Sequence, residues 1–309
     1  MKKTCMALFL SVASLCTMVL TVTNANAATV TDSRGTFTLD TTPKRIVALE
    51  FSFVDALAVV GVSPVGIADD NDRKRILPAI REKIAPWTSV GTRSQPSLEV
   101  IASLKPDLII ADVDRHSAVF NELEKIAPTL LLPSRRETYT SNLRSAAIIG
   151  KVVGKDHEMQ DVLAKHDTKM NDFKQRFINK GFADTTLLFG VARENGFYAH
   201  AQASYAGGVI QALGLKGLKK LDNETASRQI SLEQLLALNP DYLIVGDYTS
   251  NSIITTQWDK QPLWSLLTAA KEHHIYHVDG NLWARCRGIL AAEQMANDLM
   301  HNLLPAKEE

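Results

Sequence analysis

Short apolar runs alternate with segments of helical spacing along the first half of the chain. The runs have the length and the bounding turn residues of buried strands, while the segments between them place apolar residues three or four positions apart. Strands are expected at residues 46–49, 64–68, 107–111 and 129–132, and helices at residues 54–60, 74–84, 97–104 and 116–126. This alternation predicts an α/β lobe with a parallel sheet covered on both faces.

The second half of the chain repeats the alternation. Strands are expected at residues 186–192, 241–245 and 275–279, and helices at residues 205–213, 231–238, 263–270 and 287–304. A further helix is expected at residues 139–153, at the end of the first half. One motif occurs once in each half: Ser97-Leu98-Glu99 leads to Pro106-Asp107, and Ser231-Leu232-Glu233 leads to Pro240-Asp241. The copies are about one domain length apart, which favours two similar lobes with a cleft between them over a solenoid of short repeats.

Residues 154–180 connect the two halves and are unusually polar. Their apolar residues, among them Met159, Val162, Met170 and Phe173, fall on one stripe, and most other positions are charged. A helix of this length would run about 33 Å. A flexible hinge would be rich in Gly and Ser, and this segment is not, so we expect a stiff connecting helix.

Residues 1–27 resemble an export signal. Lys2 and Lys3 form a positive start, residues 6–22 are mostly apolar, and Ala25-Asn26-Ala27 fits a cleavage site. A lipoprotein signal is disfavoured because Leu15 precedes Cys16, where a small residue is wanted. We therefore expect an exported chain, with residues 28–153 as the N-terminal lobe, residues 154–180 as the connecting helix and residues 181–309 as the C-terminal lobe.

Composition and motifs narrow the classes of function. Basic and acidic residues balance at 34 each, whereas a nucleic-acid-binding protein is normally basic. The sequence has no glycine-rich nucleotide motif, no G-x-S-x-G elbow and no H-E-x-x-H pair, so a secreted α/β enzyme is the disfavoured alternative. Cys286 has no neighbouring base that would make it a nucleophile. His273, His274 and His277 crowd into one short strand and would not converge on a metal, so no metal site is predicted.

Several segments carry a resemblance to a known family. They are residues 43–49, 90–92 and 264–269, the late Trp283 and the two Ser-Leu-Glu/Pro-Asp segments. Together they resemble the periplasmic substrate-binding proteins of iron-siderophore and vitamin B12 ABC importers, the class with a helical backbone. Residues 68–72, 91–99, 135–139 and 283–289 are further similar to the ferric citrate-binding members of that class.

The resemblance implies a monomer of two Rossmann-like lobes with mostly parallel sheets, joined by one long rigid helix and working in the periplasm. It also implies one glutamate on each lobe that pairs with arginines of the two permease subunits of an inner-membrane ABC importer with its cytoplasmic ATPase. By their place in the repeated motif these are Glu99 and Glu233. A single glutamate at a helix start is explained more simply as a carboxylate that interacts favourably with the helix dipole. Because the glutamate occurs at the equivalent position on both lobes, the docking role is favoured here.

The implied ligand is ferric dicitrate, whose iron is already surrounded by oxygen ligands. The protein then needs no cofactor and no metal ligands of its own, and iron is bound only as its citrate chelate. It needs guanidinium groups that match carboxylate pairs, and in open α/β sheets ligands lie outside the carboxyl ends of the strands. Another ferric siderophore, haem or cobalamin is the alternative ligand.

Arginines follow strand ends in both halves of the chain. For one arginine alone, a solvated surface position explains the residue equally well, but recurrence in both lobes favours a site. The predicted ligand-binding residues are Arg93, Arg115, Arg135, Arg193, Tyr205, Tyr248, Trp283 and Arg285. Neighbouring candidates at the same edges are His116, Arg136, Tyr198 and Arg287.

Overall fold

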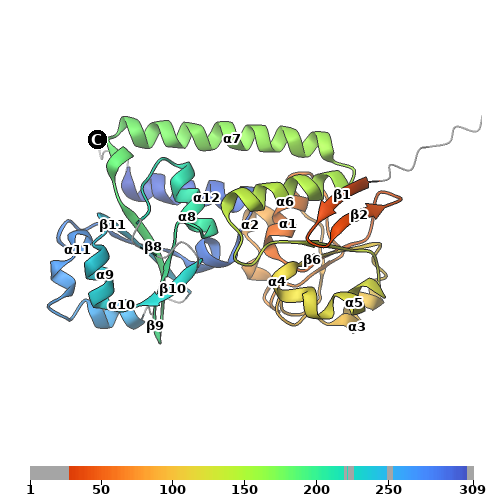
Figure 1. Ribbon diagram of the computed structural model, residues 1–309, viewed down its shortest axis with the longest axis horizontal. Coiled ribbons are helices and arrows are strands. Elements are labelled where there is room, and N and C mark those ends of the chain that lie inside the picture. Colours follow the sequence, from red (N-terminus) through yellow and green to blue (C-terminus); the bar gives the residue numbers. More distant parts are fainter. Residues whose placement is uncertain (1–27, 219–220, 222–225, 249–252, 305–309) are drawn as a thin grey trace, which may run out of the picture.

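Two α/β lobes lie side by side in the computed structural model, and one long helix, α7 (Asp156–Asn179), runs along both of them (Figure 1). The structure describes residues 28–218, 221, 226–248 and 253–304, so the expected export signal lies outside the described residues. The helix α7 falls within the segment predicted to connect the lobes, and it buries Met159, Met170, Phe173 and Phe177 on one side. Among the described residues, no helix is both long and apolar enough to cross a bilayer.

The N-terminal lobe is built on a parallel sheet with the strand order β5-β4-β3-β6-β7. Its strands are β3 (Ile46–Ala48), β4 (Gly66–Ile67), β5 (Thr88–Ser89), β6 (Leu108–Asp112) and β7 (Thr129–Leu132). Every residue of β3, β4, β6 and β7 is buried, as expected for strands covered on both faces. An antiparallel hairpin at the start of the lobe consists of β1 (Ala28–Asp32) and β2 (Gly35–Leu39).

The helices of this lobe begin where polar side chains cap them. The hydroxyl of Ser97 accepts a hydrogen bond from the N–H of Val100, and that of Thr138 accepts one from Ser141, which satisfies donors that a helix start leaves free. The helices are α1 (Phe51–Val59), α2 (Pro78–Arg81), α3 (Leu98–Ser103), α4 (Val113–His116), α5 (Phe120–Glu124) and α6 (Tyr139–Val152), with 3₁₀ turns η1 (Arg73–Arg75) and η2 (Ser117–Val119).

The C-terminal lobe has a mixed sheet with the strand order β10-β9-β8-β11-β12. Its strands are β8 (Leu187–Arg193), β9 (Gly196–His200), β10 (Ser227–Ile230), β11 (Tyr242–Asp247) and β12 (Ile275–Asp279). The strands β8, β11 and β12 are parallel, as predicted. The antiparallel strands β9 and β10 were not predicted, because the chain returns directly from β8 through Gly196 instead of entering a helix.

The helical elements of this lobe cover both sides of its sheet (Figure 1). They are η3 (Phe182–Asp184), α8 (Tyr205–Ala212), α9 (Leu232–Leu238), α10 (Ile253–Trp258), η4 (Trp264–Leu266), α11 (Thr268–Lys271), the π-helical turn η5 (Asn281–Arg285) and α12 (Ile289–Leu303). Ser231 and Gln234 form a reciprocal capping box at the start of α9. The expected fold class, an α/β protein of two lobes with mostly parallel sheets and a long connecting helix, is confirmed.

The two lobes share one hydrophobic core. A single cluster of buried side chains contains Phe53 of α1, Phe177 of α7, Phe189 of β8 and Met295 of α12. The helix α12 packs against α1 of the N-terminal lobe as well as against α7 and α8. The connection between the lobes is therefore wider than the single helix α7 that the sequence predicted.

Asp55 of α1 fixes this interface with a buried carboxylate. It accepts hydrogen bonds from the backbone N–H groups of Ile289 at 2.8 Å, Leu290 at 3.1 Å and Ala291 at 3.2 Å. These are donors at the start of α12 that have no partner within the helix. Gly288 has a φ of +136°, and a Cβ on it would collide with the carboxylate of Asp55. A residue of one lobe thus caps the last helix of the other.

We predict that Asp55→Ala lowers the free energy of unfolding by about 2–4 kcal/mol, because several buried N–H groups lose their acceptor at once. Urea denaturation of the purified protein measures the loss. Asp172→Ala, at an exposed position of α7, is the matched control and should change stability by less than about 0.5 kcal/mol. Equal stability of the two variants would contradict the capping role.

Candidate functional site

A cavity of about 670 Å³ lies between the lobes, within the usual size of a small-ligand site. Residues of both lobes line it. The N-terminal lobe contributes the segment from Arg135 to Thr138 and Arg115, and the C-terminal lobe contributes residues of β8, β9, α8 and the segment before α12. The charged and aromatic lining residues are Arg115, Arg135, Arg136, Glu137, Arg193, Tyr198, His200, Tyr205, Tyr248, Trp283 and Arg287.

Five arginines and one carboxylic acid therefore face the same space, which favours an anion as its occupant. Guanidinium groups match the geometry of carboxylate pairs with two parallel hydrogen bonds. Because the arginines come from both lobes, a ligand in the cavity can contact both lobes at once.

Asp112 positions the two loops that carry the N-terminal arginines. It ends β6, is fully buried, and accepts hydrogen bonds from the backbone N–H groups of Arg115 at 2.9 Å, Ser134 at 2.8 Å and Arg135 at 3.0 Å. One carboxylate thus holds the loop after β6 and the loop after β7 together. These backbone contacts fix where the side chains of Arg115 and Arg135 start, and both side chains line the cavity.

Glu50, which does not line the cavity, offsets part of the positive charge of Arg115 and Arg93. Its fully buried carboxylate lies 2.5 Å from Nε of Arg115 and 3.6 Å from a terminal nitrogen of Arg93. Burial raises the pKa of Glu50, while the charges of Arg93 and Arg115 act against that shift. Arg115 therefore reaches the cavity already paired with an acid on its inner side.

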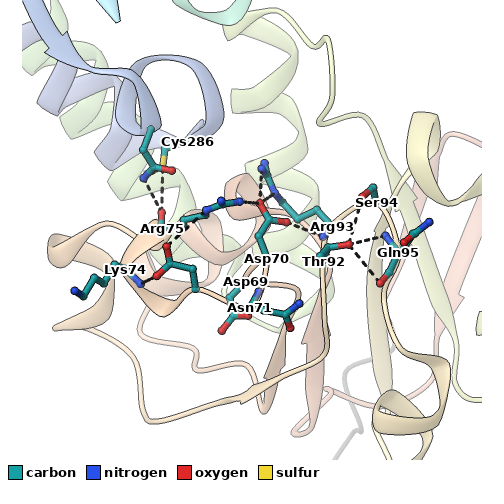
Figure 2. Close-up of polar contacts among 12 residues, drawn as sticks. Asp69, Asp70, Asn71, Lys74, Arg75, Thr92, Arg93, Ser94, Gln95 and Cys286 are labelled. Atoms are coloured by element: carbon teal, nitrogen blue, oxygen red, sulfur yellow. Dashed lines mark hydrogen bonds and ion pairs between the residues drawn. The ribbon is translucent and has the colours of Figure 1, made fainter. Parts of the chain in front are cut away.

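Arg93 is paired with the carboxylate of Asp70 (Figure 2). It donates to the carboxylate of Asp70 from Nε at 3.1 Å and from a terminal nitrogen at 2.8 Å, and its guanidinium lies 3.9 Å from the centre of the Phe51 ring. Although burial raises the pKa of Asp70, hydrogen bonds from Arg93 and Arg75 lower it to about 2. The side chain of Arg93 is buried and does not line the cavity.

The same cluster contains a second contact between the lobes. The backbone carbonyl of Arg75 accepts a hydrogen bond from the side-chain nitrogen of Asn281 at 3.0 Å and lies 3.5 Å from Sγ of Cys286 (Figure 2). Burial raises the pKa of Cys286 to about 12, so its sulfur stays a protonated thiol. Cys286 is therefore a buried side chain that packs at the interface between the lobes.

Of the eight predicted ligand-binding residues, six line the cavity. These are Arg115, Arg135, Arg193, Tyr205, Tyr248 and Trp283. Arg93 and Arg285 do not line it: Arg93 pairs with Asp70, and the guanidinium of Arg285 lies 3.8 Å from the ring centre of Tyr248. Arg136, Tyr198 and Arg287, which the sequence offered as neighbouring candidates, line it as well.

Some predicted lining residues have clear packing roles. The Tyr205 hydroxyl donates to the carbonyl of Gly288 at 2.5 Å, and Nε1 of Trp283 donates to Asp298 at 2.9 Å.

Glu137 and His200 also line the cavity and were missed by the sequence analysis. Glu137 directly follows Arg135 and Arg136, so its position after a strand end could have suggested it, whereas His200 lies on the unpredicted strand β9.

Glu99 and Glu233 occupy equivalent positions on the two lobes. Each is the second residue of a helix capped by a serine, α3 and α9 respectively, and each is exposed. A hydrogen bond with the side chain of Ser231 lowers the pKa of Glu233. Both helices lie on the side of the molecule away from α7 (Figure 1).

Two of the three clustered histidines contact different neighbours. His274 stacks on Tyr242 with ring centres 4.0 Å apart, and Nδ1 of His277 lies 2.5 Å from the carboxylate of Asp247. Within the described parts of the chain, no group of three or more His, Cys, Asp or Glu residues is arranged to hold a metal ion.

The fold, the two-lobed cleft and the sequence define the class of this protein. The chain belongs to the periplasmic binding protein family, whose sequence profile matches residues 46–282. It is thus a substrate-binding protein and not an enzyme, and the predicted resemblance to that class is confirmed.

Two curated relatives are similar over most of their length. The Fe(3+) dicitrate-binding periplasmic protein FecB of Escherichia coli K12 is 52% identical over 281 residues, covering 91% of this chain and 92% of the relative. The Fe(3+)-citrate-binding protein YfmC of Bacillus subtilis 168 is 42% identical over 269 residues, covering 87% and 84%. Among solved structures, Staphylococcus aureus SirA complexed with staphyloferrin B matches with a TM-score of 0.79 and 26% identity, covering 89% of this chain and 98% of SirA.

We predict that Asp112→Ala lowers the free energy of unfolding by about 2–4 kcal/mol, since three buried or part-buried N–H groups lose their acceptor. Chemical denaturation checks the value. Asp114→Ala, two residues away at an exposed position of α4, is the control and should stay within about 0.5 kcal/mol of the parent protein. If Asp112→Ala were as stable as the control, the carboxylate would not be what holds the two loops.

Proposed function

We propose that this protein captures ferric dicitrate in the arginine-lined cavity between its lobes and delivers it, in the periplasm, to an inner-membrane ABC importer. The observation that supports this most is the convergence of five arginines from both lobes on one cavity. The names of the two curated relatives, which bind ferric citrate or dicitrate, support the same ligand.

The chemistry of the cavity suits an intact chelate. In ferric dicitrate the iron is held by citrate oxygens, and the outer surface presents carboxylates. Arginine side chains pair with those carboxylates without touching the iron, so the protein binds iron only as its citrate chelate and uses no cofactor. Arg193 lies over the rings of Tyr198 and Tyr248, 5.0 and 5.6 Å from their centres, so the two tyrosines hold a guanidinium at the cavity wall.

Another ferric siderophore is the main alternative cargo, and the structural likeness to SirA in complex with staphyloferrin B supports that alternative. Haem or cobalamin would need a larger apolar share in the cavity wall than five arginines leave. We propose the protein works as a monomer after removal of residues 1–27, with Glu99 and Glu233 docking it onto the two permease subunits and an ATPase on the cytoplasmic side.

We predict that Arg193→Gln combined with Arg287→Gln weakens ferric citrate binding by at least about 100-fold, because each lost charged hydrogen bond costs about 1.5–3 kcal/mol. Quenching of tryptophan fluorescence on titration measures the affinity. Arg176→Gln, at an exposed position of α7, is the control and should bind as the parent protein does.

The parent protein should bind ferric citrate in preference to haem, cobalamin and a ferric hydroxamate in native mass spectrometry of the mixed panel. Preference for one of the other compounds would overturn the proposed cargo. Parental affinity of the double arginine variant would overturn the proposed cavity instead.

We predict that Glu99→Ala combined with Glu233→Ala leaves ferric citrate affinity unchanged and abolishes uptake by cells that carry the importer. Both side chains are exposed and neither lines the cavity, so only docking should suffer. Glu158→Ala combined with Asp172→Ala removes the same charge from α7 and should leave uptake intact. Uptake of labelled iron as citrate is the measurement, and normal uptake by the Glu99/Glu233 variant would contradict the docking role.

A further inference from the structure

Glu137 is the one acidic side chain among the cavity-lining residues that the structure describes. It follows Arg135 and Arg136 in the segment between β7 and α6, and it is only 4% exposed. Its Oε1 accepts a hydrogen bond from the side-chain nitrogen of Asn142 at 2.9 Å. Its Oε2 is buried and, among the described residues, has no hydrogen-bond partner. A buried polar atom without a partner is costly, and at the wall of a binding cavity it points to a ligand.

The charges around Glu137 come from several elements. Arg287, from the segment before α12, is the cation with the largest effect on the pKa of Glu137, while Asp112 at the end of β6 and Glu50 before α1 add negative charge. Burial raises the pKa of Glu137 to about 8, against the opposing effects of Arg287 and of the hydrogen bond from Asn142. At neutral pH this carboxyl group therefore carries its proton.

Protonation decides what Glu137 can do for an anion. A carboxylate only accepts hydrogen bonds and repels another carboxylate, whereas a carboxylic acid has one O–H to donate. His200, which lines the same cavity, has a buried Nδ1 without a partner among the described residues, and burial lowers its pKa to about 3. The wall thus holds two uncharged polar groups beside its arginines.

We propose that Glu137 is a specificity-determining residue that binds the ligand as a carboxylic acid, its Oε2–H donating a hydrogen bond to a carboxylate oxygen of the chelate. The arginines supply charge to the other carboxylates, and Glu137 supplies a donor without adding charge. This inference rests on the proposed function, because it requires an anionic oxygen ligand in the cavity.

The consequence is a loss of affinity in alkali. As the pH rises through about 8, Glu137 ionises, loses its donor and places a negative charge beside the anion. If only the protonated form binds, affinity falls about tenfold between pH 7 and pH 9, in proportion to the protonated fraction. Arginines keep their charge over this range and do not contribute to the change.

The test is the affinity for ferric citrate at a series of pH values from 6.5 to 9, for the parent protein, Glu137→Gln and Glu122→Gln. Glutamine has the same shape and a permanent N–H donor, so the Glu137→Gln profile should lack the fall that the parent shows. Glu122→Gln, at an exposed position of α5, should follow the parent. All three proteins meet the same ligand solutions, so changes in the chelate itself cancel in the comparison.

Parallel profiles for the parent and Glu137→Gln would overturn the role of Glu137 while leaving the proposed cargo intact. No binding of ferric citrate by the parent at pH 7 would overturn the proposed function itself. Calorimetry of the parent protein at pH 8, in buffers of different ionisation enthalpy, gives a readout that needs no variant. Binding should take up about half a proton per ligand, and zero uptake would also overturn the inference.

Discussion

The cap that Asp55 places on the start of α12 fixes the geometry on which the cavity depends. Arg287 lies two residues before Ile289, the first residue whose N–H group Asp55 accepts, while Arg115 and Arg135 belong to the same lobe as Asp55. The hydrogen bonds that join the lobes therefore also set the spacing between the arginines on opposite walls. Such a site is largely preformed, and a ligand need not supply energy to assemble it.

Buried carboxylates separate the arginines into those that stabilise the fold and those that remain available to an anion in the cavity. Arg93 is paired with Asp70 and stacked on Phe51, so it stabilises the loop after β4 and leaves no free donor edge for cargo. Arg193 and Arg287 have no such acid partner among the described ion pairs, and they keep their charge for an anion in the cavity. Proximity to a strand end brings an arginine near the site, but the carboxylates around it decide whether it is available.

Local patterns in the sequence predicted most of the fold and part of the site. The buried runs of β3, β6 and β11 and the single stripe of α7 were readable because each follows from periodicity within one segment. The strand β9 was missed although Asn195-Gly196 is a hairpin signal. The pairing of Arg93 with Asp70 and the raised pKa of Glu137 could not be read from the sequence, because both come from residues that only the folded chain brings together.

The shared core also constrains the order in which the parts of this molecule can fold. The helix α12 is the last element of the chain, yet it covers α1, the first helix of the first lobe. The face of α1 that α12 covers consequently stays open until the end of the polypeptide has been synthesised. Each lobe also has a hydrophobic cluster of its own, so it is the shared core, and not the whole of either lobe, that depends on α12.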